Sequence, residues 1–172
     1  NKASGIVVGK FGASVVTKDE LSSLDDREKI TTLDEILKAV PTLKGKTVVT
    51  NGCFDIFHAG HVSLLDRAKK LGDHLIVLVN SDTSVEFLKG RGRPVNALQD
   101  RMSVLAALEC VDYVVPFDSA TPEKEIERIR PHILVKGADY TPETIRGTDL
   151  VKSYGGTVVV LPKTHGVTST EL

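Results

Sequence analysis

Five short apolar runs, separated mostly by helical patterns, constrain the fold of this chain more than any other feature. The runs cover residues 48–50, 75–80, 113–117, 133–136 and 157–161. Each run is continuously apolar, as expected of a strand that is covered on both faces. Helical patterns are predicted at about residues 60–71, 97–109, 122–129 and 142–154. This succession predicts an α/β fold with a parallel, doubly wound, five-stranded sheet and right-handed crossovers.

The first run leads into a loop and a predicted helix start, within TVVTNGCFDIFHAGHVSLLDRAKKL at residues 47–71. His58 and His61 bracket Gly60, and a glycine lets a phosphate approach the backbone closely. A helix N-terminus exposes backbone N–H groups and the positive end of the macrodipole, so an anion is expected over residues 60–61. The pattern favours a functional site over a simple helix cap. A zinc pair is the weaker alternative, because no Cys or acidic residue lies at ligand spacing.

Polar residues also follow the other predicted strands, where open α/β sheets place their ligands. Asn80 and Asp82 follow the second strand, and Lys89, Arg91 and Arg93 come shortly after them. These three cations alternate with glycines, which indicates either a flexible segment that wraps a polyphosphate or an exposed connector.

A lysine ends the fourth strand, and three hydroxyl residues follow the fifth. Lys136 must enter a polar site or be paired, because burying an ammonium alone is costly. Thr168, Ser169 and Thr170 are typical of a helix N-terminus that holds phosphate oxygens.

Composition excludes several classes of partner. The chain has 172 residues and a net charge of −1, which suits one domain without an electrostatic footprint for nucleic acid or an anionic membrane. No apolar run approaches the roughly 20 residues of a membrane span, and no secretory signal is recognised. Cys53 and Cys110 form no disulfide framework, which indicates a reducing cytoplasm. Cys53 is interpreted as a small apolar filler more readily than as a catalytic thiol.

The N-terminal part is divided from the main domain at about residue 46. Residues 22–30 are polar and suit a linker, while Thr32 and Glu35 form a capping-box pattern that predicts a short helix ending near Pro41 and Gly45. The predicted organisation is therefore a remnant at 1–21, a linker and lead-in helix at 22–45, and the main domain at 46–172.

The stretch NGCFDIFHAGH at residues 51–61 resembles the signature of the cytidylyltransferase-like nucleotidyltransferases, whose His-x-Gly-His element holds a triphosphate. Residues 46–172 resemble, more narrowly, the heptose 1-phosphate adenylyltransferase domain of bifunctional ADP-heptose enzymes. Residues 1–21 are similar to the end of a ribokinase-like sugar kinase domain. The resemblance implies a Rossmann-like sheet of order 3-2-1-4-5, and a chain that a heptose kinase domain precedes in the full-length protein.

The same resemblance implies roles for individual residues. The expected catalytic residues are His58, His61 and Lys89. The expected nucleotide-binding residues are Asn51, Gly52, Cys53, Phe54, His58, Gly60, His61, Arg101, Lys136, Gly137, Thr168, Ser169 and Thr170. The expected substrate-binding residues are Asp55, Asn80, Asp82, Arg93, Asp139 and Tyr140.

Three assignments stay open between a site role and a structural role. Arg101 is either a phosphate ligand or a member of a structural ion pair, and Asp55 binds sugar hydroxyls or tethers its loop. Tyr140 could simply pack on Pro142. The element beginning at Lys163 departs from the superfamily pattern, which has Arg there, and lysine gives up bidentate geometry.

The implied reaction is transfer of AMP from ATP to D-glycero-β-D-manno-heptose 1-phosphate, which gives ADP-heptose and pyrophosphate for lipopolysaccharide core synthesis. Mg²⁺ is expected on the triphosphate and water, with no protein side chain as a metal ligand. A homodimer is expected from family habit. The alternatives are a CTP- or GTP-dependent relative that acts on glycerol phosphate or another sugar phosphate, and a non-catalytic nucleotide-binding module.

Overall fold

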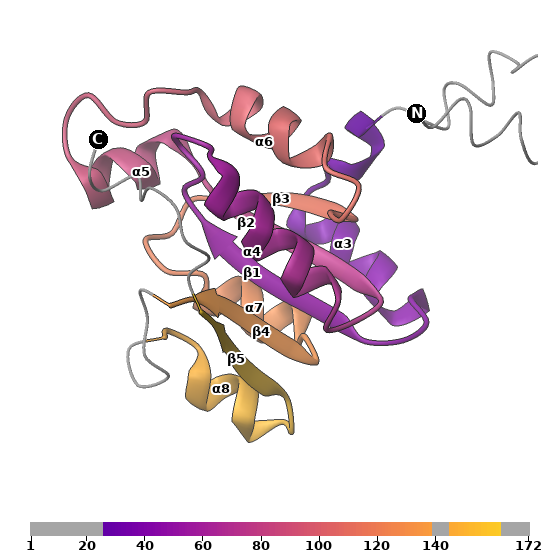
Figure 1. Ribbon diagram of the computed structural model, residues 1–172. Coiled ribbons are helices and arrows are strands. Elements are labelled where there is room, and N and C mark those ends of the chain that lie inside the picture. Colours follow the sequence, from indigo (N-terminus) through magenta and orange to yellow (C-terminus); the bar gives the residue numbers. More distant parts are fainter. Residues whose placement is uncertain (1–25, 139–144, 163–172) are drawn as a thin grey trace, which may run out of the picture.

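A parallel sheet of five strands forms the centre of the molecule in this computed structural model, which describes residues 26–138 and 145–162 (Figure 1). The strands are β1 (Thr47–Gly52), β2 (His74–Asn80), β3 (Tyr113–Phe117), β4 (Ile133–Gly137) and β5 (Thr157–Leu161). Their order is β3-β2-β1-β4-β5, and every neighbouring pair is parallel. This confirms the fold class and the strand order expected from the sequence.

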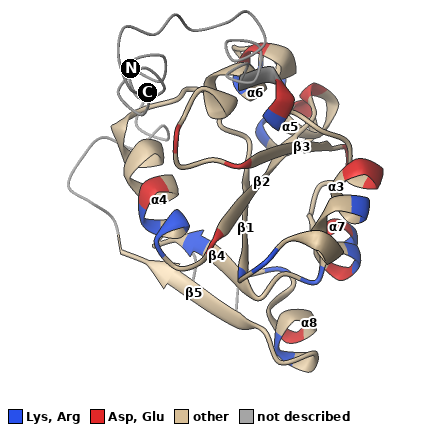
Figure 2. Cartoon of the chain, turned by 90° about the vertical axis from the view of Figure 1, so that its right-hand side faces the viewer, with Lys and Arg blue, Asp and Glu red and all other residues tan. Residues whose placement is uncertain are grey.

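Helices cover both faces of the sheet, as Figure 2 shows. One face carries α4 (Ala59–Lys69) and α6 (Leu98–Ala106), and the other carries α3 (Leu33–Ala39), α7 (Glu123–Ile129) and α8 (Thr148–Ser153). Successive strand residues enter opposite cores: Val48 packs with α4 and α6, whereas Val49 packs with α3 and α7. Both valines are fully buried, which explains why the strands read as continuous apolar runs.

Four predicted helices are present with shifted ends, and a further helix was missed. The missed helix, α5 (Asp82–Lys89), occupies residues for which the sequence predicted no helix, and only its last residue, Lys89, belongs to the stretch interpreted as a flexible segment or a connector. Ser81 caps α5, because its hydroxyl accepts the Ser84 N–H at 3.2 Å. Helix α8 is shorter than predicted: it begins at Thr148, after Gly147 in a left-handed conformation with φ of +90°.

Residues 26–45 pack against the sheet. A 3-10 helix, η1 (Asp26–Lys29), leads to Ile30, which forms a parallel bridge with Val114 of the edge strand β3. The predicted capping box is confirmed, since Thr32 accepts the Glu35 N–H while the Glu35 carboxylate accepts the Thr32 N–H. Helix α3 then places Ile36 in the core, and η2 (Val40–Thr42) follows. The boundary proposed at residue 46 stays a prediction, and residues 1–21 lie outside the described residues.

Strand order reverses around β1, which lies between β2 and β4. Open α/β sheets bind ligands at the carboxyl ends of their strands near such a reversal. The residues that follow β1, β2 and β4 are therefore where the site is to be sought. None of the helices in the described part is long and apolar enough to cross a lipid bilayer.

Candidate active site

A cavity of about 310 Å³ opens at the carboxyl ends of the strands. It brings together five residues that the sequence predicted for the site: Asn51, Gly52, Cys53, Asn80 and Lys136. They come from the ends of β1, β2 and β4. Because residues 51 and 136 are more than eighty positions apart, only the parallel pairing of β1 with β4 makes them neighbours.

The two predicted imidazoles lie together at the start of α4. His58 is the N-cap: its Nδ1 accepts the Gly60 N–H at 3.1 Å, while His61 Nδ1 accepts the His58 N–H at 3.3 Å. Their ring centroids are 3.9 Å apart. Since both Nδ1 atoms accept, the proton of each neutral ring is on Nε2. Neither Nε2 has a partner within the described ranges, so both are available as donors to a ligand.

Burial keeps His61 uncharged at neutral pH. The pKa of His61 is lowered to about 4, mainly by desolvation, and His58 and Lys89 contribute in the same direction. The ring stacks on Phe57, with centroids 5.3 Å apart, and meets the buried Phe54 edge-on at 5.5 Å. His61 is therefore held as a neutral hydrogen-bond donor.

The N-terminus of α4 differs from what the sequence suggested, which was a helix start with free backbone N–H groups. The Gly60 N–H donates to His58 Nδ1, and the His61 N–H donates to the His58 carbonyl at 2.9 Å. An anion over residues 60–61 would therefore compete with His58 for these donors. In this conformation the site offers imidazole N–H groups where backbone N–H groups were expected.

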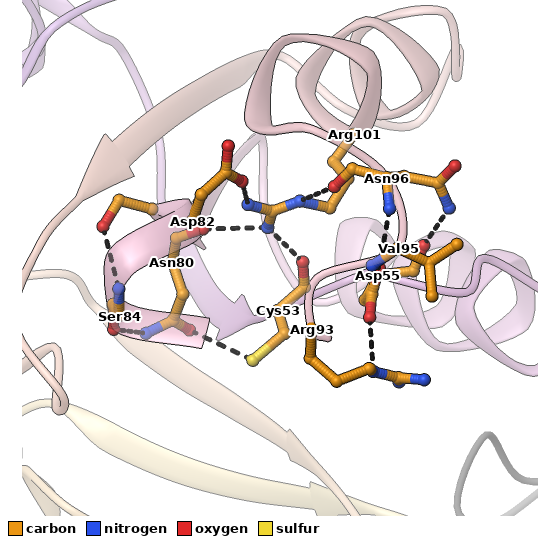
Figure 3. A network of polar contacts seen from close by, with 10 residues as sticks. Cys53, Asp55, Asn80, Asp82, Ser84, Arg93, Val95, Asn96 and Arg101 are labelled. Atoms are coloured by element: carbon orange, nitrogen blue, oxygen red, sulfur yellow. Dashed lines mark hydrogen bonds and ion pairs between the residues drawn. The ribbon is translucent and has the colours of Figure 1, made fainter. Parts of the chain in front are cut away.

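Arg101 is a structural residue in the arrangement shown in Figure 3. Its guanidinium donates to the Cys53 carbonyl at 2.6 Å, the Asn80 carbonyl at 2.8 Å and the Asn96 carbonyl at 3.0 Å. It also pairs with Asp82 at 2.7 Å, and its side chain is only 1% exposed. Of the two sequence-based alternatives, the structure shows the ion pair. These four acceptors occupy the guanidinium, and the nucleotide-binding role of Arg101 stays a prediction.

Asp55 tethers the segment that precedes α6. One carboxylate oxygen accepts the N–H groups of Val95 at 2.7 Å and Asn96 at 3.1 Å, and the other lies 2.8 Å from Arg93 Nε. The Asp55 side chain has no exposed surface, so its carboxylate is committed to this segment (Figure 3). The structure shows the loop tether, and the predicted sugar-binding roles of Asp55 and Arg93 find no support in these contacts.

Lys136 and Cys53 line the cavity in different charge states. The Lys136 ammonium donates to the Asn51 carbonyl at 3.2 Å, and burial lowers the pKa of Lys136 to about 8. Burial also raises the pKa of the Cys53 thiol, which leaves it protonated at neutral pH. The thiol donates to Asn80 Oδ1 at 3.8 Å, and the Asn80 amide donates to Ser84 at 2.8 Å. These contacts agree with Cys53 as a small filler.

Lys89 lies at the C-terminus of α5 with its side chain exposed. Its charge contributes to the pKa shifts of both His61 and Cys53, which places its ammonium near both groups. Gly137 ends β4, and a Cβ built on it would meet no atom of the described residues within 4 Å.

Sequence reasoning missed several residues of the cavity wall: Leu88, Ala120, Thr121, Pro122 and Arg146. Residues 120–122 follow β3, so the rule that ligands meet strand ends could have found them. No local sequence pattern indicated that Arg146 belongs to the site. Asp139, Tyr140, Thr168, Ser169 and Thr170 lie outside the described residues, and their predicted roles stay predictions.

The described residues offer no group of three or more His, Cys, Asp or Glu side chains that could hold a metal ion. The two carboxylates nearest the site, Asp55 and Asp82, are paired with arginines. A divalent ion would find no preformed protein cage among these residues.

Comparison with known proteins identifies the class. The cytidylyltransferase-like family model matches residues 49–171, and the chain belongs to this family. The sequence-based recognition of the superfamily is therefore confirmed.

Particular relatives are also recognised over the whole chain. The chain is 48% identical over 179 residues to the bifunctional protein HldE of Nitrosococcus oceani, and 51% identical over 180 residues to that of Actinobacillus pleuropneumoniae serotype 5b. Both alignments cover all of this chain, which spans 38% of the length of these relatives.

Solved structures agree with the fold. A lipopolysaccharide core biosynthesis protein from Thermoplasma volcanium is 25% identical and aligns over 72% of this chain and 99% of its own, with a TM-score of 0.58. A pantoate-beta-alanine ligase from Francisella tularensis, 17% identical, aligns over 80% of this chain and 67% of its own, with a TM-score of 0.57. This second likeness concerns the fold alone.

Proposed function

We propose that this chain transfers AMP from ATP to D-glycero-β-D-manno-heptose 1-phosphate, giving ADP-heptose and pyrophosphate. The HldE relatives match the entire chain at about half identity, and their name describes a bifunctional protein. The observation that carries the proposal is the pair of imidazoles at the start of α4, both with the proton on Nε2, beside the carboxyl end of β1. Two imidazole N–H donors at that place suit the phosphate oxygens of a bound nucleotide.

The reaction needs no covalent enzyme intermediate. A phosphate oxygen of the sugar 1-phosphate attacks the α-phosphorus of ATP, a new P–O bond forms, and the bond to the β-phosphate oxygen breaks as pyrophosphate leaves. The acceptor is already an anion, so no general base is required. Catalysis then depends on positioning and on stabilising the charge that develops on the phosphate oxygens.

The described residues divide these tasks. His58 and His61 donate from Nε2 to α- and β-phosphate oxygens, Lys136 supplies positive charge in the cavity wall, and Lys89 supplies it close to His61. Arg101 and Asp55 bind no substrate; they hold the loop around residue 53 and the segment at 93–96 in place. We assign Mg²⁺ to the triphosphate oxygens and water, and no protein side chain to it.

The test measures pyrophosphate release with ATP, CTP and GTP, each against heptose 1-phosphate, glycerol phosphate and a hexose 1-phosphate. We expect turnover with ATP and heptose 1-phosphate. Substituting His61→Ala should lower turnover on the order of 10²–10³-fold, as expected for the loss of one donor to the transition state. His74→Gln is the matched control, because His74 lies at the opposite end of the sheet, at the start of β2.

Each other outcome identifies an alternative. Preferred turnover with CTP or GTP would show that ATP is not the nucleotide substrate. Turnover with glycerol phosphate would show that heptose 1-phosphate is not the acceptor. Nucleotide binding without any release of pyrophosphate would indicate a non-catalytic module. Near-normal turnover of the His61→Ala variant would remove His61 from the mechanism.

The biological setting is part of the same proposal. A sugar kinase domain preceding this chain would supply its phosphorylated substrate, and both reactions would take place in the cytoplasm, where ATP is available. A homodimer is proposed as well. Light scattering of the full-length protein would test it, since a mass of one chain would exclude the dimer.

A further inference from the structure

A second cavity, of about 420 Å³, lies at the amino ends of β1, β4 and β5. Its wall includes Lys46, Arg130, His132 and Tyr154. Lys46 directly precedes β1 and His132 directly precedes β4, whereas the candidate active site contains Asn51 and Lys136 from the opposite ends of the same strands. With about 3.3 Å of rise per strand residue, the two cavities are roughly 15–20 Å apart.

The charged groups in the described wall of this second cavity are basic, and no acidic residue is among the described residues that line it. Lys46 and Arg130 are exposed, and neither forms an ion pair within the described ranges. Asp73 lies near this segment, but its carboxylate accepts the backbone N–H of Lys46 at 2.7 Å. Two cations thus face a concave surface without a carboxylate in its wall.

His132 adds a donor of fixed orientation. Its Nδ1 accepts the backbone N–H of Thr47 at 3.1 Å. The proton of the neutral ring is therefore on Nε2, which has no partner among the residues described. The contact with Thr47 holds the ring in place, so a ligand need not order it.

Arg130 and Tyr154 form the remaining polar part of the wall. The guanidinium carbon lies 4.9 Å from the centroid of the Tyr154 ring, a cation–π contact that restrains the arginine. Arg130 is the C-cap of α7 and has a left-handed backbone, with φ of +50°, which is a common way for a helix to end. The Tyr154 hydroxyl is buried without a hydrogen-bond partner in the described structure, and a buried hydroxyl normally has one.

We propose that this cavity binds the phosphate group of a small phosphorylated molecule. Two unpaired cations and an oriented imidazole N–H match the charge and acceptor-rich oxygens of a phosphate. The cavity volume lies within the usual range for small-molecule sites, so it accommodates an organic part as well. The site is separate from the proposed transferase centre and does not depend on that assignment.

The test is a titration of the ¹⁵N-labelled 172-residue chain, followed by amide NMR at constant ionic strength. The probes are inorganic phosphate and ribose 5-phosphate, with chloride as the reference anion. We expect saturable shifts at Arg130, His132, Gly155 and Gly156. Saturation by ribose 5-phosphate alone would show that the organic part is required, and saturation by both probes would show that the phosphate group suffices.

Variants separate specific binding from general charge effects. Lys46→Gln with Arg130→Gln should weaken binding by about tenfold or more, as for the loss of charge-assisted hydrogen bonds. Lys44→Gln with Lys124→Gln changes the net charge equally at exposed positions and should leave binding unaltered. Tyr154→Phe should weaken binding less than the charge variant does. His61→Ala should leave these shifts intact, since His61 lies in the first turn of α4, near the opposite ends of the strands.

Three results would overturn the proposal. The first is the absence of saturable shifts at the four amides with either probe, and the second is an equal response to chloride. The third is unchanged binding by the Lys46→Gln, Arg130→Gln variant. Loss of the shifts in His61→Ala alone would instead assign them to the candidate active site.

Discussion

Replacing Arg101 with methionine should destabilise the fold by about 3–5 kcal/mol, because it leaves several carbonyl acceptors without their donor. The structure shows where this cost arises. The guanidinium joins the carbonyls of Cys53 and Asn80, which end two adjacent strands. Removing it leaves buried acceptors unpaired, at about 1–3 kcal/mol each. The assay is urea unfolding followed by circular dichroism.

The partner carboxylate should matter much less. The Asp82 side chain is 49% exposed, so water replaces the arginine, and Asp82→Asn should cost about 1 kcal/mol or less. Arg67→Met is the matched control, because Arg67 is exposed and donates to the single carbonyl of Pro162. If Asp82→Asn lowers the free energy of unfolding as much as Arg101→Met does, the stabilisation comes from the ion pair with Asp82 and not from the hydrogen bonds to the two carbonyls. If Arg101→Met keeps full stability but loses nucleotide affinity, Arg101 is a phosphate ligand after all.

Two further predictions concern protonation. Burial lowers the pKa of Lys136 to about 8, whereas its value in the unfolded chain is near 10.5. Between these two pH values the unfolded chain binds more protons than the folded one. The free energy of unfolding should therefore rise with pH from about 8 to 10.5. Lys136→Met should therefore be more stable than the parent at pH 7, by up to about 3 kcal/mol, with a difference that shrinks above pH 8; a constant difference would refute the shift. In a ¹H NMR titration the His61 ring should titrate near pH 4, and stability should fall on acidification from about pH 6.5 to 4. A midpoint above pH 6 would show that the ring is solvated.

The local patterns that sequence analysis used are those with a short physical range. The capping box of Thr32 and Glu35 predicted the start of α3, because both partners lie within one helical turn. The strands were recognised because burial on both faces excludes polar residues from their middle. Helix α5 was missed because no helix was predicted between the second strand and residue 97, and the cap at Ser81 was not considered.

The roles of charged residues required the tertiary structure. Arg101 and Asp55 look the same in sequence whether they bind a phosphate, a sugar or the protein itself. Their partners are 48 and 40 positions away, at Cys53 and Val95, and these distances are closed only by the fold. The second cavity was also invisible, because Lys46, Arg130 and His132 meet only where parallel strands start side by side.

The sequence by itself determined the class of fold, the order of its elements and the place of the imidazole pair. These follow from the alternation of apolar runs and from residues that are close together along the chain. Only the tertiary structure decided which tautomer each imidazole adopts. It also decided which cations are bonded to the strand ends and which remain available to a ligand. The reason is physical: hydrogen-bond partners and desolvation depend on neighbours that long-range packing supplies.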